Sequence, residues 1–224
     1  MIHAPTPELH RLPAAALRRE LRSRLTGCCY TDSDVRVGGV SRASLERMRA
    51  MFPAQPTPAA VLIPLVDRGE ELTVLLTHRA TALKHHPGQI SFPGGRLEPG
   101  DENAVAAALR ETEEEIGLRR EFIEVIGCLP DHVVISGYRV TPVVGLVRPG
   151  FELVLDPTEV SGTFEAPLRH LLDPATHAKR IHRVGDENLE VLDLPWGDHR
   201  IWGATAGMLL TLREVLGGTA LHGD

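Results

Sequence analysis

The feature that most constrains the fold of this chain is a helical pattern at residues 102–116, close to the middle of the sequence. On a helical wheel of about 100° per residue, one stripe of this helix is formed by Val105, Leu109, Thr112 and Ile116. Such a stripe has to be buried against another element. Gly117 predicts a left-handed cap at the end of the helix, and Asp101 predicts a side-chain cap at its start.

Patterns typical of β-strands lie on both sides of this helix. Before it, residues 61–66 and 72–78 predict two strands, with Pro64 placing the first of them at a sheet edge or a bulge. After it, we expect strands at 122–126, 139–147 and 151–155, a hairpin with its turn at 184–188, and helices at 166–172 and 204–216. Because strands and helices alternate irregularly, the sequence predicts an α/β fold with a mixed β-sheet covered by helices.

The first 58 residues differ from the rest in having helical rather than strand patterns. Leucines repeat every four residues at 17, 21 and 25, which predicts a short helix over 13–25 that Gly27 can end. A second helix is expected over 41–51. We therefore predict an N-terminal helical extension over 1–58 and a main domain over 59–224. The extension is expected to pack on the main sheet or to form a contact in a homodimer.

Charge and hydropathy limit the partners that such a chain can have. The net charge is −6, which argues against nucleic acid as a partner because nucleic-acid binding needs a basic face. No apolar run approaches the roughly 18 residues of a membrane span, and the N-terminus has no apolar segment of a secretory signal. The three cysteines show no disulfide or zinc spacing. We therefore expect a cytoplasmic protein without a membrane partner.

Four glutamates near the end of the 102–116 helix carry the strongest chemical signal. Glu111, Glu114 and Glu115 share one side of the wheel, whereas Glu113 lies on the other. These like charges repel one another, and the helix macrodipole disfavours acids at this end. A divalent cation would reverse both effects, and carboxylate oxygens suit Mg²⁺ or Mn²⁺. We predict that these three glutamates bind the metal and that Arg110 braces Glu114; the alternative is a solvated acidic helix face.

The loop before the helix favours the metal site over that alternative. Gly94 and Gly95 follow Pro93, and glycines allow a backbone to approach a ligand closely and to take positive φ angles. We therefore predict that both glycines contact the substrate of the site.

A small-molecule substrate that carries phosphates would be repelled by the net negative charge of this chain unless local cations offset it. Residues 78–86 contain five basic or histidine side chains and no acid. We predict that Arg79, Lys84 or His86 binds phosphate; the alternative is that they are solvated loop cations. Gln89 could bind the substrate too, or could instead hydrogen-bond the backbone of its own loop.

Residues 94–118 resemble the conserved box of the Nudix hydrolases. That pattern is Gly, five residues, Glu, seven residues, and then Arg-Glu-apolar-x-Glu-Glu-x-Gly-apolar. Residues 110–118 match its second half, with Thr112 at the apolar position. In the first half, six residues rather than five separate Gly95 from Glu102, so no role is carried over to Glu102. The resemblance implies catalytic roles for Arg110, Glu111 and Glu114.

The spacing that is longer by one residue resembles that of a subgroup of this family, the coenzyme A diphosphatases. The upstream segment 75–95, LLTHRATALKHHPGQISFPGG, resembles a second signature of the same subgroup. Weaker matches at 140–145, 159–168 and 201–206 extend the resemblance over about residues 60–210. It implies the Nudix fold, an α/β/α sandwich. It also implies hydrolysis of coenzyme A to 4′-phosphopantetheine and adenosine 3′,5′-bisphosphate.

Three hypotheses about function remain open at this point. The first is a coenzyme A diphosphatase, in which Glu111, or as second choice Glu114, takes the proton of the attacking water. The second is the same chemistry on another diphosphate, such as ADP-ribose, a dinucleotide or a nucleoside triphosphate. The third is a non-catalytic ligand-binding module, against which the intact Arg110 and its glutamates argue.

Overall fold

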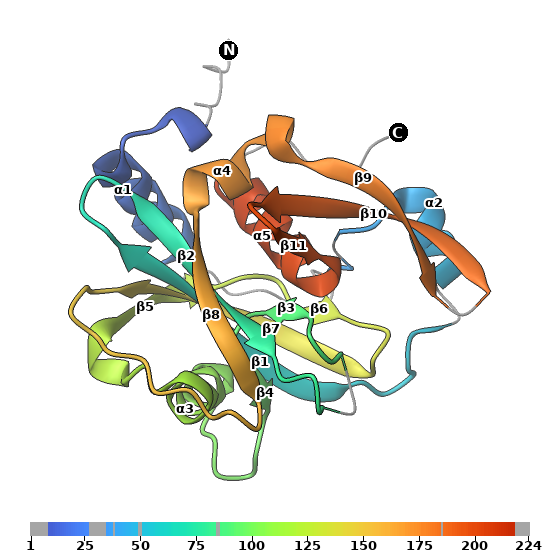
Figure 1. Cartoon of the computed structure of the whole chain (residues 1–224), viewed down its shortest axis with the longest axis horizontal. Coiled ribbons are helices and arrows are strands. Elements are labelled where there is room, and N and C mark those ends of the chain that lie inside the picture. The colour runs from blue at the N-terminus through green and yellow to red at the C-terminus, as the bar shows by residue number, and fades with distance from the viewer. Residues whose placement is uncertain are drawn as a thin grey trace.

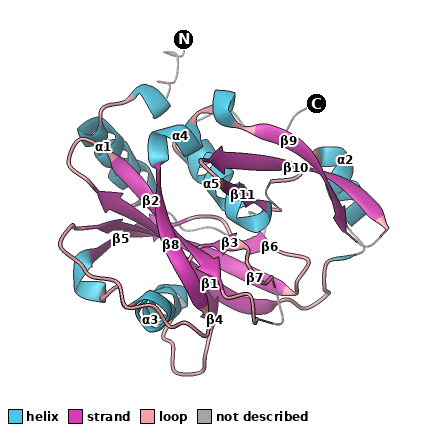
Figure 2. Ribbon diagram, viewed as in Figure 1, coloured by secondary structure: helices cyan, strands magenta, loops and turns pink. Residues whose placement is uncertain are grey.

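The centre of the fold is a pair of parallel strands in a mixed sheet (Figures 1 and 2). The computed structural model describes residues 9–26, 35–37, 39–48, 51–83, 86–184 and 186–217. Strand β1 (Thr57–Asp67) pairs in parallel with β7 (Tyr138–Val147) from Thr57 to Val66. Its other edge pairs antiparallel with two strands in turn, β4 (Gly94–Arg96) and then β2 (Leu72–Arg79).

Four further strands complete the eight-stranded main sheet. They are β3 (Ile90–Ser91) and β8 (Val160–Pro167), which pair with β2, and β5 (Ile123–Cys128) and β6 (His132–Val133), which pair with β7. All four pairings are antiparallel, whereas β1 and β7 are parallel. The predicted mixed sheet is therefore confirmed.

The prediction that Pro64 lies at an edge or bulge was wrong. Pro64 lies inside β1 opposite Gly145 of β7, in the centre of the sheet. A proline is tolerated there because the other side of β1 changes partner at this point. Residues 59–61 pair with β4 and residues 65–67 pair with β2, so Pro64 lies between the two ladders.

Helices cover both faces of the main sheet, as Figure 1 shows. Helix α3 (Ala104–Ile116) packs on one face, where Ala107 and Ala108 contact Leu62 and Val143. The other face carries α1 (Ala14–Leu25), α4 (Leu168–Leu172) and α5 (Gly203–Val215), which contribute leucines to the largest apolar cluster. This is the predicted α/β/α arrangement. Short 3₁₀ helices occur at Leu9–Arg11, Arg120–Phe122 and Pro174–Thr176.

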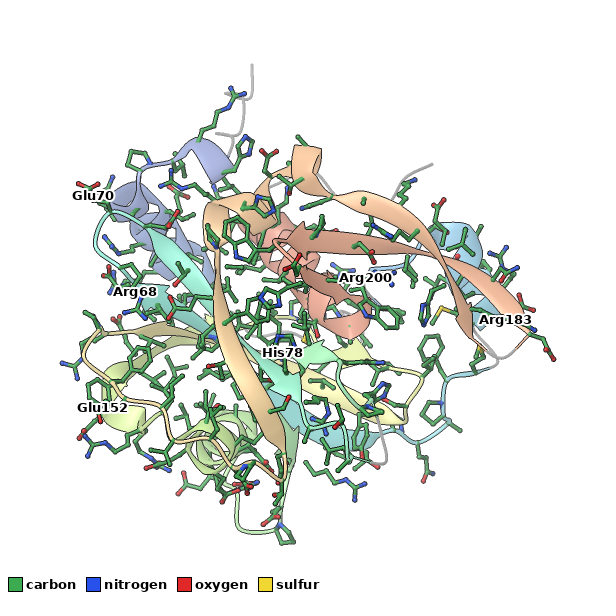
Figure 3. The ribbon with its side chains drawn as sticks, viewed as in Figure 1. Arg68, Glu70, His78, Glu152, Arg183 and Arg200 are labelled. Atoms are coloured by element: carbon green, nitrogen blue, oxygen red, sulfur yellow. The ribbon has the colours of Figure 1, made fainter. Side chains whose placement is uncertain are left out.

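A second sheet of three antiparallel strands lies beside α5. Strands β9 (Ala178–Val184) and β10 (Glu187–Trp196) form the predicted hairpin, and β11 (His199–Trp202) adds a strand that was not predicted. An aromatic stack joins the two sheets. His199 stacks on Phe164 of β8 with ring centroids 3.7 Å apart and lies 5.1 Å from the ring of His78, which is labelled in Figure 3.

The predicted strand at residues 151–155 is absent from the structure, although its apolar side chains are used. Phe151, Leu153 and Leu155 pack against the cluster around Ile116, while the intervening Val154 is 73% exposed. The backbone of this segment bonds to a helix end instead of a strand. The Val154 amide donates to the carbonyl of Ile116, at 3.0 Å. The side chains of this segment are therefore buried and exposed in alternation although its backbone does not pair with a strand.

The described N-terminal residues contact both sheets. Helix α1 buries Leu17, Leu21 and Leu25 in the main core. Helix α2 (Arg42–Met48) lies within the helix predicted over 41–51, of which residues 49 and 50 lie outside the described part of the chain, and it packs on β10. The predicted end of the first helix, Gly27, lies outside the described residues. In the part of the chain that is described, no helix has the length and apolar character needed to cross a membrane.

Candidate functional site

The start of α3 differs from the prediction in a way that matters for the site. Asn103, not Asp101, caps the helix, because its Oδ1 accepts from the Ala106 amide at 3.0 Å. Asp101 instead accepts from Arg110, at 3.1 Å from Nε and 2.9 Å from Nη2. The Glu98 amide donates to Asp101 Oδ2 at 2.8 Å and fixes this carboxylate. The loop before the helix therefore positions Arg110.

Arg110 connects the loop to the acidic side of the helix. Its Nη1 donates to Glu111 Oε1 at 2.9 Å and to Glu114 Oε2 at 3.0 Å. Its Nη2 also donates to the backbone carbonyl of Arg96 in β4, at 3.2 Å. Asp101, the strongest contributor, and Glu111 raise the pKa of Arg110, so the guanidinium stays charged. The arginine braces Glu114 as expected, and it holds Glu111 and β4 as well.

Glu111 lies directly against the glycine-rich strand. A Cβ atom placed on Gly95 would lie 2.5 Å from the carboxyl carbon of Glu111, so any side chain at this position would displace that carboxylate. Burial raises the pKa of Glu111, an effect that Arg110 opposes and that Glu114 and Glu159 reinforce. Gly95 thus provides the space in which Glu111 sits.

Glu115 lies on the buried side of α3. This corrects the prediction from the helical wheel, which placed it on the flank of the buried stripe. The residue is 4% exposed, and its Oε2 accepts from the Gly94 amide at 3.2 Å. Burial raises the pKa of Glu115 to about 8; the Gly94 bond and Arg79 lower it, while Glu159 and Glu111 raise it further. The Gly94 bond and Arg79 do not offset the cost of burying this charge, so without a bound cation the side chain is mostly protonated at neutral pH.

The structure adds a fourth carboxylate, Glu159, which was not among the predicted site residues. It lies near enough to Glu111 and Glu115 to raise the pKa of both. A tight turn before β8 fixes its backbone: the Ala80 amide donates to its carbonyl at 2.7 Å, and its own amide donates to the Asp156 carbonyl at 3.1 Å. The only sequence signal for it was the weak family match at 159–168.

The predicted phosphate-binding residues are only partly brought together. Arg79, at the end of β2, faces the carboxylates, since it lowers the pKa of Glu115. Its Nε is buried and makes no hydrogen bond within the described part of the chain. His86 is exposed with a positive φ of 55°, and its carbonyl accepts from the Gln89 amide at 3.3 Å. Lys84 lies outside the described residues.

Gln89 is placed by its backbone. The Arg79 amide donates to the Gln89 carbonyl at 3.0 Å, and the Gly88 amide donates to the Arg79 carbonyl at 3.1 Å. These bonds close the loop between β2 and β3. These are backbone bonds, so both roles of the Gln89 side chain, in binding the substrate and in bonding its own loop, stay predictions.

The carboxylates are chemically suited to a divalent cation, although they do not form a complete set of metal ligands. Among the described residues, no three His, Cys, Asp or Glu side chains are arranged to hold a metal ion. Arg110 draws Glu111 and Glu114 together, whereas Glu115 turns to Gly94. Mg²⁺ needs only one or two protein carboxylates, because water and substrate phosphates complete its shell. A bound ion would offset the repulsion by which Glu159 raises the pKa of Glu111 and Glu115, and it would favour their charged forms.

Comparison with known proteins identifies the domain that contains this site. A family model described as "NUDIX domain" matches residues 56–184. The chain is 42% identical over 161 residues to "Uncharacterized Nudix hydrolase NudL" of Escherichia coli (strain K12), covering 71% of this chain and 82% of that protein. The protein of the same name in Enterobacter sp. (strain 638) matches with the same identity and coverage.

Two solved structures resemble part of the chain. An Ap4A hydrolase binary complex from C. elegans is 22% identical, with a TM-score of 0.43 over 49% of this chain and 80% of that one. The Nudix hydrolase RenU from M. smegmatis is 24% identical, with a TM-score of 0.43 over 51% and 72% of the two chains.

Proposed function

Since the chain belongs to the Nudix hydrolase family, we propose that it hydrolyses the diphosphate of coenzyme A, or of a coenzyme A derivative, to 4′-phosphopantetheine and adenosine 3′,5′-bisphosphate. The observation that carries the hydrolase part is the contact of Gly94 and Gly95 with Glu115 and Glu111. The coenzyme A part is supported by the segment 75–95 and by the added residue between Gly95 and Glu102.

Glu111, Glu114 and Glu115 would hold the divalent ion, Mg²⁺ or Mn²⁺. When bound, this ion supplies charge neutralisation for the diphosphate and a water of lowered pKa. Arg110 acts as a positioning residue, because it fixes Glu111 and Glu114 relative to β4. The protein's own part in metal binding is thus to keep several carboxylates close together without enough cations to neutralise them.

Glu111 is our first choice for the group that takes the proton from the attacking water, and Glu114 is the second. Burial raises the pKa of Glu111, which makes its carboxylate a stronger base than an exposed one. Glu114 is 60% exposed at its side chain. Arg79, Lys84 or His86 would bind the phosphates of the substrate, and Gln89, Gly94 and Gly95 would contact it as well.

The experiment that tests this proposal is an incubation of the full chain with Mg²⁺ or Mn²⁺ and a panel of diphosphates, followed by product identification by mass spectrometry. We expect turnover of coenzyme A to the two named products and its complete loss in excess EDTA. Good turnover of ADP-ribose or a dinucleotide without turnover of coenzyme A would reject the substrate but keep the chemistry. No turnover of any diphosphate would reject the hydrolase proposal.

A further inference from the structure

Two side chains that the proposed mechanism does not use form a pair beside the glycine-rich strand. Both Nε and Nη2 of Arg96 donate to the hydroxyl of Tyr138, at 3.1 and 2.7 Å. The guanidinium carbon also lies 5.4 Å from the centre of the Tyr138 ring. Arg96 is exposed and Tyr138 is partly exposed, so solvent reaches the pair. We call these two residues the Arg96–Tyr138 pair.

The sheet places this pair on the face opposite α3 and at the same end as the carboxylates. Arg96 pairs with Ala59 of β1, and Ala59 pairs with Val140 of β7, two residues after Tyr138. The small side chain of Ala59 leaves room for Arg96 to reach across β1 to the phenol ring. Because neighbours along a strand point to opposite faces, Gly95 faces Glu111 while Arg96 faces away.

Backbone bonds hold the pair at a fixed distance from the site. The Arg96 carbonyl accepts from Arg110, the residue that holds Glu111 and Glu114. The Leu97 amide donates to the Pro58 carbonyl at 3.1 Å, which fixes the end of β4 on β1. A ligand that lies over Gly94 and Gly95 can therefore meet Arg96 at the next position of the same strand.

The charge of Arg96 is unneutralised, in contrast to that of Arg110. Three carboxylates accept hydrogen bonds from Arg110. Within the described residues, no carboxylate lies within ion-pair distance of Arg96, whose partner is the neutral phenol of Tyr138. A guanidinium whose partner is a neutral oxygen gains from an anion, because the anion adds an attraction between opposite charges and can accept two parallel N–H bonds.

We propose that the Arg96–Tyr138 pair binds a phosphate group of the substrate that the reaction does not cleave. Arg96 would donate its planar pair of N–H groups to phosphate oxygens. Tyr138 would support the guanidinium with its ring and donate its hydroxyl to the same group. This inference rests on the proposed function, because it assumes that the substrate carries a phosphate besides those of the scissile bond. In coenzyme A that group is the ribose 3′-phosphate.

The first test compares steady-state kinetics of Arg96→Met, Tyr138→Phe and the control Arg148→Met on coenzyme A and 3′-dephospho-coenzyme A. Arg148 is also exposed but follows the opposite end of β7 from Tyr138. We expect Arg96→Met to raise KM for coenzyme A by at least about 10-fold, with kcat within about 3-fold, and to leave KM for the dephospho substrate unchanged. Tyr138→Phe should raise KM by about 3-fold. An unchanged KM in Arg96→Met, or an equal rise in Arg148→Met, would overturn the inference.

The second test reads binding without hydrolysis, so it separates this inference from the proposed function. Calorimetry in EDTA measures the affinity of each variant for adenosine 3′,5′-bisphosphate and for 5′-AMP. A loss of affinity in Arg96→Met for the bisphosphate alone supports the inference. An equal loss for both ligands would place the pair at the 5′-phosphate, which belongs to the cleaved diphosphate, and would overturn the inference. Unchanged affinities with a lower Tm in Arg96→Met would show that the pair acts in stability alone, and no binding of the bisphosphate by the wild-type protein would also overturn the inference. These outcomes hold even if no diphosphate is hydrolysed.

Discussion

Two clusters of arginine and carboxylate in this molecule differ in charge balance. In the second sheet, Asp193 is 1% exposed and binds two arginines, Arg180 at 2.9 Å and Arg200 at 3.2 Å. In the site, Arg110 binds Asp101, Glu111 and Glu114, while Glu115 and Glu159 lie close by and Arg79 faces Glu115. The first cluster satisfies its buried charge and the second does not. An excess of buried negative charge is costly unless something else binds there, so charge balance separates the structural cluster from the functional one.

The largest expected effect comes from neutralising the most buried acid of the site. Glu115→Gln should lower kcat/KM by about 10³-fold, because it removes a metal ligand while keeping the side-chain shape. The matched control is Glu113→Gln on the exposed side of the same helix, where the nearest cation is Arg120 at 3.7 Å. Full activity of Glu115→Gln would remove this residue from the ligand set. A comparable loss in Glu113→Gln would mean that any charge on α3 matters.

Replacement of the acid that the structure added should have the next largest effect. Glu159→Gln should lower kcat by about 10- to 100-fold. It should also move the acid limb of the pH–rate profile to lower pH, because Glu159 raises the pKa of Glu111. The control is Glu152→Gln, an exposed acid of the preceding segment that points outward in Figure 3. An unchanged rate and pH profile would place Glu159 outside the working site.

The balanced cluster should respond in stability rather than in activity. Asp193→Asn leaves two arginines without their acid and should lower the free energy of unfolding by about 2 kcal/mol, less than the removal of a fully buried partner because both arginines reach solvent. Activity per folded molecule should stay within about 2-fold. The control Asp186→Asn removes an exposed partner of Arg183 and should change stability by less than about 0.5 kcal/mol. Urea unfolding and rate assays on the same samples measure both. A large loss of activity in Asp193→Asn would break the distinction between the two clusters.

The smallest expected effect is a pH dependence of the stability of the metal-free protein. The pKa of Glu115 is about 8 in the fold and about 4.5 when unfolded, so between these values the folded state binds more protons. Stability should therefore fall as pH rises from about 5 to 8, by about 1 kcal/mol in total after allowance for relaxation of the site. Thermal unfolding in EDTA measures this slope, which Glu115→Gln should flatten. Mg²⁺ should raise the Tm of the wild-type protein more at pH 8 than at pH 5. If the substitution leaves the slope unchanged, the titration of Glu115 is not the cause of the pH dependence of stability.

Local patterns predicted those features that depend on neighbouring residues. The end of α3 at Gly117, whose φ is 68°, follows from glycine chemistry, and the apolar runs of β1 and β7 follow from strand burial. The helical wheel placed Glu111 and Glu114 on one side, where both accept from Arg110. It misjudged the burial of Glu115, because burial depends on how closely α3 approaches the sheet, and alanines at 107 and 108 allow a close approach.

The remaining features depend on contacts between distant parts of the chain. Asp101 is a plausible helix cap by its position, and only the folded loop shows that its carboxylate binds Arg110 instead. Residues 151–155 alternate like a strand, but their backbone partners are carbonyls at the end of α3. Glu159 reaches the site because β8 pairs with β2, so Val160 lies opposite Arg79. Periodicity within one segment carries no information about such pairings.

The pairing of β8 with β2 also has a consequence for how the chain folds. Thr73 lies opposite Pro167 and Leu76 opposite Phe164, so this ladder closes a loop that contains α3, β5 and β7. Contacts between such distant segments form slowly, because the entropy of closing the loop is lost before the contacts compensate for it. We therefore expect Glu159 to join Glu111 and Glu115 late in folding. By then α3 is already packed on the sheet. The folded part can therefore tolerate the repulsion between the carboxylates of Glu111, Glu115 and Glu159, which come together last.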